Sequence, residues 1–144
     1  MDNNNQVAIV RDKVQRYLID LLGNIEIDRD GDFHFRNGSS HVFVRVQPLA
    51  DTSTVVSVWA ITNADLTPTA ELYKFLATEN HYRFGNLVCD EQDGKAVIRF
   101  AHNLLGDFLD PDELKMTVAM VARTADDIDD KIKEKFGGRT FHGE

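Results

Sequence analysis

The chain has 144 residues, and its 24 acidic side chains against 16 Lys and Arg give a formal net charge of −8. At this length we expect a single domain with a sizeable core that needs neither a metal nor a disulfide. The excess of acid argues against nucleic acid and against an anionic membrane surface as the main partner, because both are bound by clustered Lys and Arg.

Cysteine content and the chain start bear on the cellular compartment. Cys89 is the only cysteine, so no internal disulfide can form, which suits a reducing compartment. The first residues, MDNNNQ, lack the basic and apolar regions of a secretory signal. No apolar run approaches the ~20 residues of a membrane span. We therefore expect a cytoplasmic protein.

The first predicted element is a helix from about Gln6 to Leu22, where apolar residues recur at spacings of three and four. The apolar stripe consists of Val7, Val10, Val14, Tyr17, Leu18 and Leu21. Gly23 follows, as is typical of a helix end. A short strand at residues 25–28 and an acidic turn at residues 29–32 come next.

A hairpin is predicted around Asn37-Gly38, the strongest short-range turn signal in the chain. It joins strands at Phe33–Arg36 and Ser39–Gln47, and a two-residue turn there would pair His34 with His41. The face expected to meet the core carries Phe33, Phe35, Val42, Val44 and Val46. The opposite face carries His34, Arg36, His41, Phe43 and Arg45. A Val-rich third strand is expected at residues 54–61.

The second half begins with a helix predicted to start at Thr67-Pro68, with Thr67 as N-cap, and to end near Asn80. A second hairpin should pair Leu87–Asp90 with Lys95–His102 through a turn containing Asp-Gly.

The last helix has a capping-box start, with Asp110 as N-cap, Pro111 in the first position and Glu113 in the third. It should run to about Phe136. The element order is α-β-β-β-α-β-β-α, which predicts one α+β domain with an antiparallel sheet and helices packed on it. We place this domain at residues 6–137, with flexible ends at residues 1–5 and 138–144.

Motifs for catalysis are missing from the sequence, and neither a cofactor nor an enzymatic activity is predicted. Glu26, Asp28, Asp30 and Gly31 resemble the start of a calcium loop, but Asn37 at the twelfth position lacks the bidentate carboxylate that such a loop needs. An acidic turn is the favoured interpretation.

His34 and His41 are the one pair that suggests a ligand site. As cross-strand neighbours their Cβ atoms would lie ~5 Å apart, near enough to share a metal. A third ligand is not evident, so no metal site is assigned. A metal- or small-ligand-binding regulatory protein using this face of the sheet remains the alternative function.

The segment Leu104–Leu109 is unusually apolar for its predicted place in a loop before the last helix. Its side chains either fold back onto the core or form a surface for a partner or a second copy, and the sequence leaves both open. The candidate partner-binding residues are Phe43, Trp59, Leu104, Leu105 and Phe108. Phe43 is chosen for its place on the non-core face, and Trp59 for the preference of Trp for interfaces.

Residues 72–138 resemble the YbjN-like proteins of actinobacteria, which are related in fold to type III secretion chaperones. The resemblance is carried by Tyr82–Leu87, His102–Leu114, Ala122–Asp130 and Phe136–Gly138. It implies the same element order, no enzymatic activity and a small acidic protein, often dimeric, that binds peptide segments of a partner. The leading hypothesis is therefore a non-enzymatic, peptide- or protein-binding, chaperone-like or regulatory module that acts as a homodimer.

Overall fold

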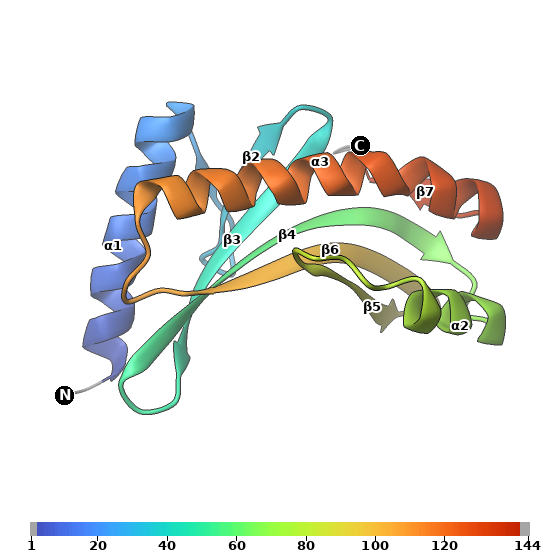
Figure 1. Cartoon of the computed structure of the whole chain (residues 1–144), viewed down its shortest axis with the longest axis horizontal. Helices are drawn as coiled ribbons and strands as arrows, with labels where there is room; N and C mark the ends of the chain where they lie inside the picture. Colours follow the sequence, from blue (N-terminus) through green and yellow to red (C-terminus); the bar gives the residue numbers. More distant parts are fainter. Residues whose placement is uncertain (1–2, 142–144) are drawn as a thin grey trace.

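The computed structural model describes residues 3–141 and shows three helices against one antiparallel sheet (Figure 1). The α+β prediction is confirmed. The strands pair in the order β1-β2-β3-β4-β6-β5, and β7 pairs with the far end of β4. In chain order the elements are α1 (Asn3–Leu22), β1 (Glu26–Ile27), β2 (Phe33–Asn37), β3 (Ser40–Leu49), β4 (Ser53–Leu66), α2 (Ala70–Thr78), β5 (Asn86–Gln92), β6 (Lys95–Leu105), α3 (Pro111–Phe136) and β7 (Arg139–Thr140).

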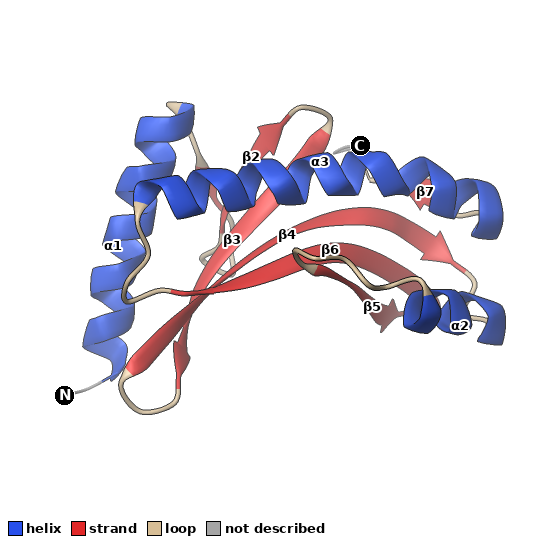
Figure 2. Ribbon diagram, viewed as in Figure 1, coloured by secondary structure: helices blue, strands red, loops and turns tan. Residues whose placement is uncertain are grey.

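The core lies between the sheet and the helices α1 and α3, which cross the same sheet face (Figure 2). The sheet contributes alternate residues to it, α1 contributes most of the apolar stripe expected from the sequence, and α3 contributes buried residues that recur at spacings of three and four. Fully buried members include Val14, Leu18, Val44, Val58, Ile98, Phe100, Val118 and Val121. We call this side of the sheet the core face and the opposite side the outer face. None of the described helices is both long and apolar enough to cross a membrane.

The β2–β3 hairpin has a different register from the one expected. Asn37 pairs with Ser40, so Gly38 and Ser39 form the turn, and His34 lies opposite Phe43 instead of His41. Gly38 has a φ of 64°, which suits the first central position of a type II′ turn. The prediction of faces survives because the register moved by two residues, and a strand repeats its faces every two.

The end of β4 and the start of α2 also differ from the prediction. β4 continues to Leu66, through two irregularities in its pairing with β6. The helix N-cap is therefore Thr69 and not Thr67, and its side chain accepts a hydrogen bond from Leu72 N at 3.1 Å. The helix ends at Thr78, before Asn80, whose side chain binds the backbone of β5.

The second hairpin is longer than predicted. Asp93 and Gly94, with φ of 52° and 77°, form the turn, and both follow the pattern of a type I′ hairpin. Because β6 continues to Leu105, Leu104 and Leu105 belong to a strand, and the prediction that they lie in a loop is wrong. The start of α3 is as predicted, since Asp110 accepts a hydrogen bond from Glu113 N at 2.8 Å.

Some of the residues expected to form loose ends are in regular structure. Helix α1 begins at Asn3, and Arg139–Thr140 pair with Asn63 and Ala64 of β4. Gly138 permits this approach, because a Cβ there would lie 2.6 Å from the Ala64 carbonyl oxygen. Residues 1, 2 and 142–144 lie outside the described residues.

Candidate functional site

The end of β6 is an open sheet edge. β6 runs to Leu105, whereas β5 begins at Asn86, which pairs with Ala101 (Figure 1). Gly106 N donates a hydrogen bond to Thr54 O of β4 at 2.9 Å. In an antiparallel pair the backbone N–H and C=O of every second residue point to the same neighbouring strand, so those of Leu104 also point toward β4. The same alternation turns those of Asn103 and Leu105 away from β4, where no described strand pairs with them.

The neighbouring edge of β5 is protected. The side-chain amide of Asn80 accepts from Leu87 N at 2.7 Å and donates to Leu87 O at 2.8 Å. This side chain takes the place that a pairing strand would occupy, which is one way of blocking an edge. This blocks pairing at Leu87, next to the open end of β6, whereas no described strand pairs with the rest of this edge of β5.

The loop after β6 is held by hydrogen bonds from two sides. The Lys13 Nζ donates to Gly106 O at 2.8 Å, and the Thr54 hydroxyl donates to Asp107 Oδ1 at 2.7 Å. Within this frame Leu109 is only 3% exposed, whereas Phe108 is 87% exposed. The two interpretations of this segment thus apply to different residues: Leu109 folds back onto the core, and Phe108 is presented to solvent.

A groove of about 400 Å³ lies between the end of β6 and the start of α3. Leu104 lines it from the core face, and Met116, which is 61% exposed, lines it from α3. Phe84 forms a further wall and stacks on His102 with ring centroids 3.8 Å apart. Burial lowers the pKa of His102 and so favours its neutral form beside this ring.

The outer face carries a row of aromatic side chains on neighbouring strands. Phe43 and Trp59 are cross-strand partners, and their rings stack with centroids 5.5 Å apart and an interplanar angle of 12°. His34 extends the row, at 5.8 Å from the Phe43 ring. The guanidinium groups of Arg45 and Arg99 lie 5.3 and 5.8 Å from the Trp59 ring. We call the rings of His34, Phe43 and Trp59 the aromatic row.

The two histidines expected to be neighbours do contact each other, although along a diagonal. His34 Nδ1 and His41 Nε2 are 2.9 Å apart, and Glu26 Oε2 lies 3.6 Å from His34 Nε2. The ring centroids are 5.1 Å apart, so the two imidazoles meet edge to edge. His34 Nδ1 and His41 Nε2 are therefore hydrogen-bonded to each other. Burial, then the charges of His34 and Arg36, lower the pKa of His41.

The acidic turn is a structured turn. Asp28 Oδ1 accepts hydrogen bonds from Asp30 N and Asp32 N, at 2.9 and 3.0 Å. Although Asp28, Asp30 and Asp32 come close enough together to hold a cation, Asp32 is buried and gives both of its oxygens to Arg45. These contacts support the interpretation of the segment as a turn.

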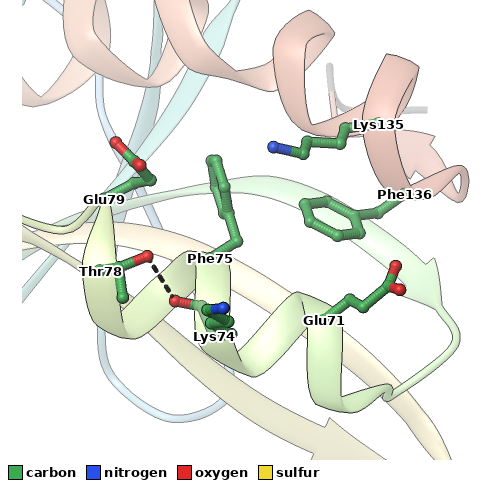
Figure 3. Close-up of a pocket in the computed structure, with 7 residues that line it drawn as sticks. All are labelled: Glu71, Lys74, Phe75, Thr78, Glu79, Lys135 and Phe136. Atoms are coloured by element: carbon green, nitrogen blue, oxygen red, sulfur yellow. Dashed lines mark hydrogen bonds between the residues drawn. The ribbon is translucent and has the colours of Figure 1, made fainter.

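A smaller hollow of about 280 Å³ lies between α2 and the end of α3 (Figure 3). Phe75 and Phe136 meet edge to face at 5.2 Å, and the Lys135 ammonium lies 5.1 Å from the Phe75 ring. Its lining joins α2 to α3 by apolar and cation–π contacts, and the Thr78 hydroxyl at its edge donates to Lys74 O at 2.7 Å.

The Cys89 thiol lies elsewhere, on β5. Burial raises the pKa of this thiol, which favours its protonated and less reactive form.

Comparison with known families decides the affiliation of the chain. The model of TY-Chap1, described as "T3SS (YopN, CesT) and YbjN peptide-binding chaperone 1", matches residues 8–144. The chain belongs to the TY-Chap1 family. The resemblance to YbjN-like proteins is thereby confirmed, and it extends over the first half of the chain as well.

Two solved structures are similar to this chain at low sequence identity. E. coli YbjN superposes with a TM-score of 0.60 at 15% identity, over 87% of this chain and 93% of that one. The Yersinia pestis type III secretion chaperone SycH, solved with a stable fragment of YscM2, gives a TM-score of 0.49 at 14% identity, over 78% and 93% of the two chains. No curated protein sequence matched the chain.

The five predicted partner-binding residues of this TY-Chap1 protein lie on two surfaces. Phe43, Trp59 and Leu105 lie on the outer face, whereas Leu104 lines the groove on the core face. Phe108 projects from the loop between them and α3. Sequence reasoning missed Phe84 and Met116 of the groove. Met116 carried a signal, since it interrupts the polar side of an amphipathic helix.

Proposed function

We propose that this chain is a non-enzymatic, chaperone-like module that binds an extended segment of a partner protein at the open end of β6. Membership in a family described as peptide-binding chaperones supports peptide binding in general. The observation that carries the proposed site is the stretch of β6 beyond Ala101, which pairs with β4 on one side and has no described strand on the other, and which presents the exposed Leu105 close to the exposed Phe108. Action in the cytoplasm stays part of the prediction.

Addition of a strand is the mode of binding that this edge favours. A partner strand beside β6 would bond to the backbone of Asn103 and Leu105, which gives affinity independent of sequence. Its side chains would point alternately to the two faces of the sheet. One set would enter the groove beside Leu104 and Met116, and the other would lie beside Leu105, so apolar residues at alternate positions would be preferred.

Replacement of Leu105 by proline tests this site. Proline has no N–H to offer an incoming strand, while the hydrogen bonds to β4 come from Leu104 and Gly106 and are retained. The matched control is Leu105→Val, which keeps the N–H and an apolar side chain. The probes are peptides selected from a display library of short random sequences on the immobilised native chain, with affinities measured by fluorescence anisotropy.

We expect Leu105→Pro to weaken these peptides by about 10-fold or more, and Leu105→Val by much less, with both variants folded by circular dichroism. Equal affinity of the native chain and Leu105→Pro would contradict strand addition at β6. Failure to select any peptide would contradict peptide binding itself.

We also propose that the module acts as a homodimer. Large apolar side chains away from the open edge support this, since Ile9 and Ile19 of α1 are exposed. Light scattering over a range of concentrations tests the proposal. The mass of a single chain at every concentration would contradict the dimer and leave peptide binding untouched.

The alternative function, a metal- or ligand-binding regulator, rests on the contact between His34 and His41. Their edge-to-edge geometry makes a metal compete with an existing hydrogen bond, and Arg36 nearby adds positive charge. We therefore place this function second. Stoichiometric metal in the purified protein, or a rise in melting temperature with Zn²⁺ that is lost in His41→Gln, would reverse this order.

A further inference from the structure

The outer face differs in charge from the rest of the chain. The chain as a whole carries −8, but the charged residues at the outward positions of the sheet are mainly basic. By strand register they include four basic residues, Arg36, Arg45, Lys95 and Arg99. The acids at these positions are Glu26 and Asp90. The negative charge is therefore concentrated on other parts of the surface, among them the exposed side of α3.

The arginines beside the aromatic row are held in place. Arg45 donates from Nε and Nη2 to the two oxygens of Asp32, at 2.7 and 2.6 Å, and Asp32 is only 3% exposed. Asp90 lies 3.4 Å from Arg99 Nε. These acids engage one side of each guanidinium, and further N–H donors remain on the group. At Arg45 a carboxylate that binds meets donors whose positions are already fixed, so less entropy is lost on binding there.

Between these arginines lies a flat apolar surface. Phe43 and Trp59 are half-buried, and their nearly parallel rings present area to solvent at the centre of the sheet. Trp and Arg together are the residue types that most often dominate binding energy at protein interfaces. An aromatic or large apolar side chain of a partner fits on the rings, and acidic side chains next to it fit on the flanking guanidinium groups.

We infer that the outer face binds an acidic peptide segment of a partner protein, with an apolar or aromatic residue on Phe43 and Trp59 and neighbouring carboxylates on Arg45 and Arg99. This inference rests on the proposed peptide-binding function and adds to it a second surface and the chemistry of the segment. Because Leu105 and Asn103 lie on the same face, one segment that adds to β6 can continue across the sheet onto the aromatic row.

Peptides selected on the native chain should show this chemistry. We expect enrichment of sequences in which Asp or Glu stands within two residues of an aromatic or large apolar residue. Arg99→Gln is the variant that removes a positive charge. Its ion-pair partner Asp90 is exposed, so the substitution leaves no unpaired charge buried in the protein. Arg123→Gln on the exposed side of α3 is its matched control, and Trp59→Leu removes the ring while keeping an apolar side chain.

We expect Arg99→Gln and Trp59→Leu each to weaken the acidic peptides by about 10-fold, because charge-assisted hydrogen bonds and buried aromatic contacts carry energies of this order. Arg123→Gln should have no effect, and higher salt should weaken binding. Enrichment of neutral or basic peptides, or unchanged affinity in Arg99→Gln, would overturn the inference.

Two further outcomes have distinct meanings. Peptides that lose affinity in Leu105→Pro but not in Arg99→Gln or Trp59→Leu would overturn the outer-face inference while supporting the function proposed for β6.

Aromatic side chains on a sheet also stack single-stranded RNA. Tighter binding of a short fluorescent RNA than of the selected peptides would replace the acidic peptide as the occupant of this face.

Discussion

The Thr54 hydroxyl donates a hydrogen bond to Asp107 Oδ1 at 2.7 Å and so ties the start of β4 to the loop that precedes α3. Gln6 of α1 donates to the same oxygen at 3.2 Å. Three elements distant in sequence thus meet at one carboxylate, and the next residue is Phe108. The exposure of this aromatic ring is therefore imposed by the fold, not by a loose loop.

Replacing Phe108 by Asp should separate binding from stability. The ring is 87% exposed, so we expect the free energy of unfolding to change by about 0.5 kcal/mol or less, while binding of selected peptides weakens. Denaturant unfolding and fluorescence anisotropy measure the two effects. Leu109→Ala is the control, because Leu109 is buried and its truncation should cost about 2–5 kcal/mol. A large loss of stability in Phe108→Asp would mean that this side chain packs on the domain.

Removal of the Asp107 carboxylate should loosen the loop. In Asp107→Ala the Thr54 hydroxyl loses its acceptor, and we expect a destabilisation of about 1–2 kcal/mol. Hydrogen exchange of the amides in residues 106–109 should become faster. Asp127→Ala, on the exposed side of α3, is the matched control. Unchanged exchange in Asp107→Ala would show that the loop is held without this carboxylate, by Lys13 and by the backbone bond from Gly106 N to Thr54 O.

Gly106 is required by close packing. An added Cβ would overlap the Thr54 hydroxyl and lie 2.9 Å from Val10 Cγ1, so Gly106→Ala should destabilise the chain by about 1–3 kcal/mol. Gly23→Ala serves for comparison: a Cβ there meets no neighbour, and any loss must come from its φ of 84°. Thermal melts of both variants measure the difference. A melting temperature of Gly106→Ala equal to that of the native chain would contradict the tight contact.

Stability should fall as the pH is lowered from 7 toward 5. Burial lowers the pKa of His41 and of His102 below the ordinary value of 6.5, so the unfolded chain takes up these protons more readily. Their contribution is complete above pH 6.5 and is lost as the pH falls through the lowered values of the folded state. His41→Gln and His102→Gln should each flatten the pH dependence of the melting temperature, and an unchanged dependence in both variants would contradict this origin.

Local sequence was enough to predict the three helices and the described strands other than β7. The cap at Asp110, the apolar stripe of α3 and the alternation along β3 each depend on residues close together in the chain, whose spacing matches the period of a helix or a strand. The choice of Phe43 as an outward residue follows from the same alternation. The YbjN-like affiliation also came from local segments.

The register and the open edge were decided by tertiary structure. The II′ turn at Gly38 is fixed with the help of Ser39 and Ser40, whose hydroxyls donate to Asp126 of α3 at 2.6 Å. Only the assembled sheet reveals that β5 pairs no further than Ala101, so that the last residues of β6 are paired with β4 on one side and open on the other. Likewise, Leu109 and Phe108 are adjacent apolar residues, and their opposite exposure depends on bonds from Lys13 and Thr54. Sequence patterns report which face a residue takes along its own element, whereas a binding surface depends on where separate elements end beside one another.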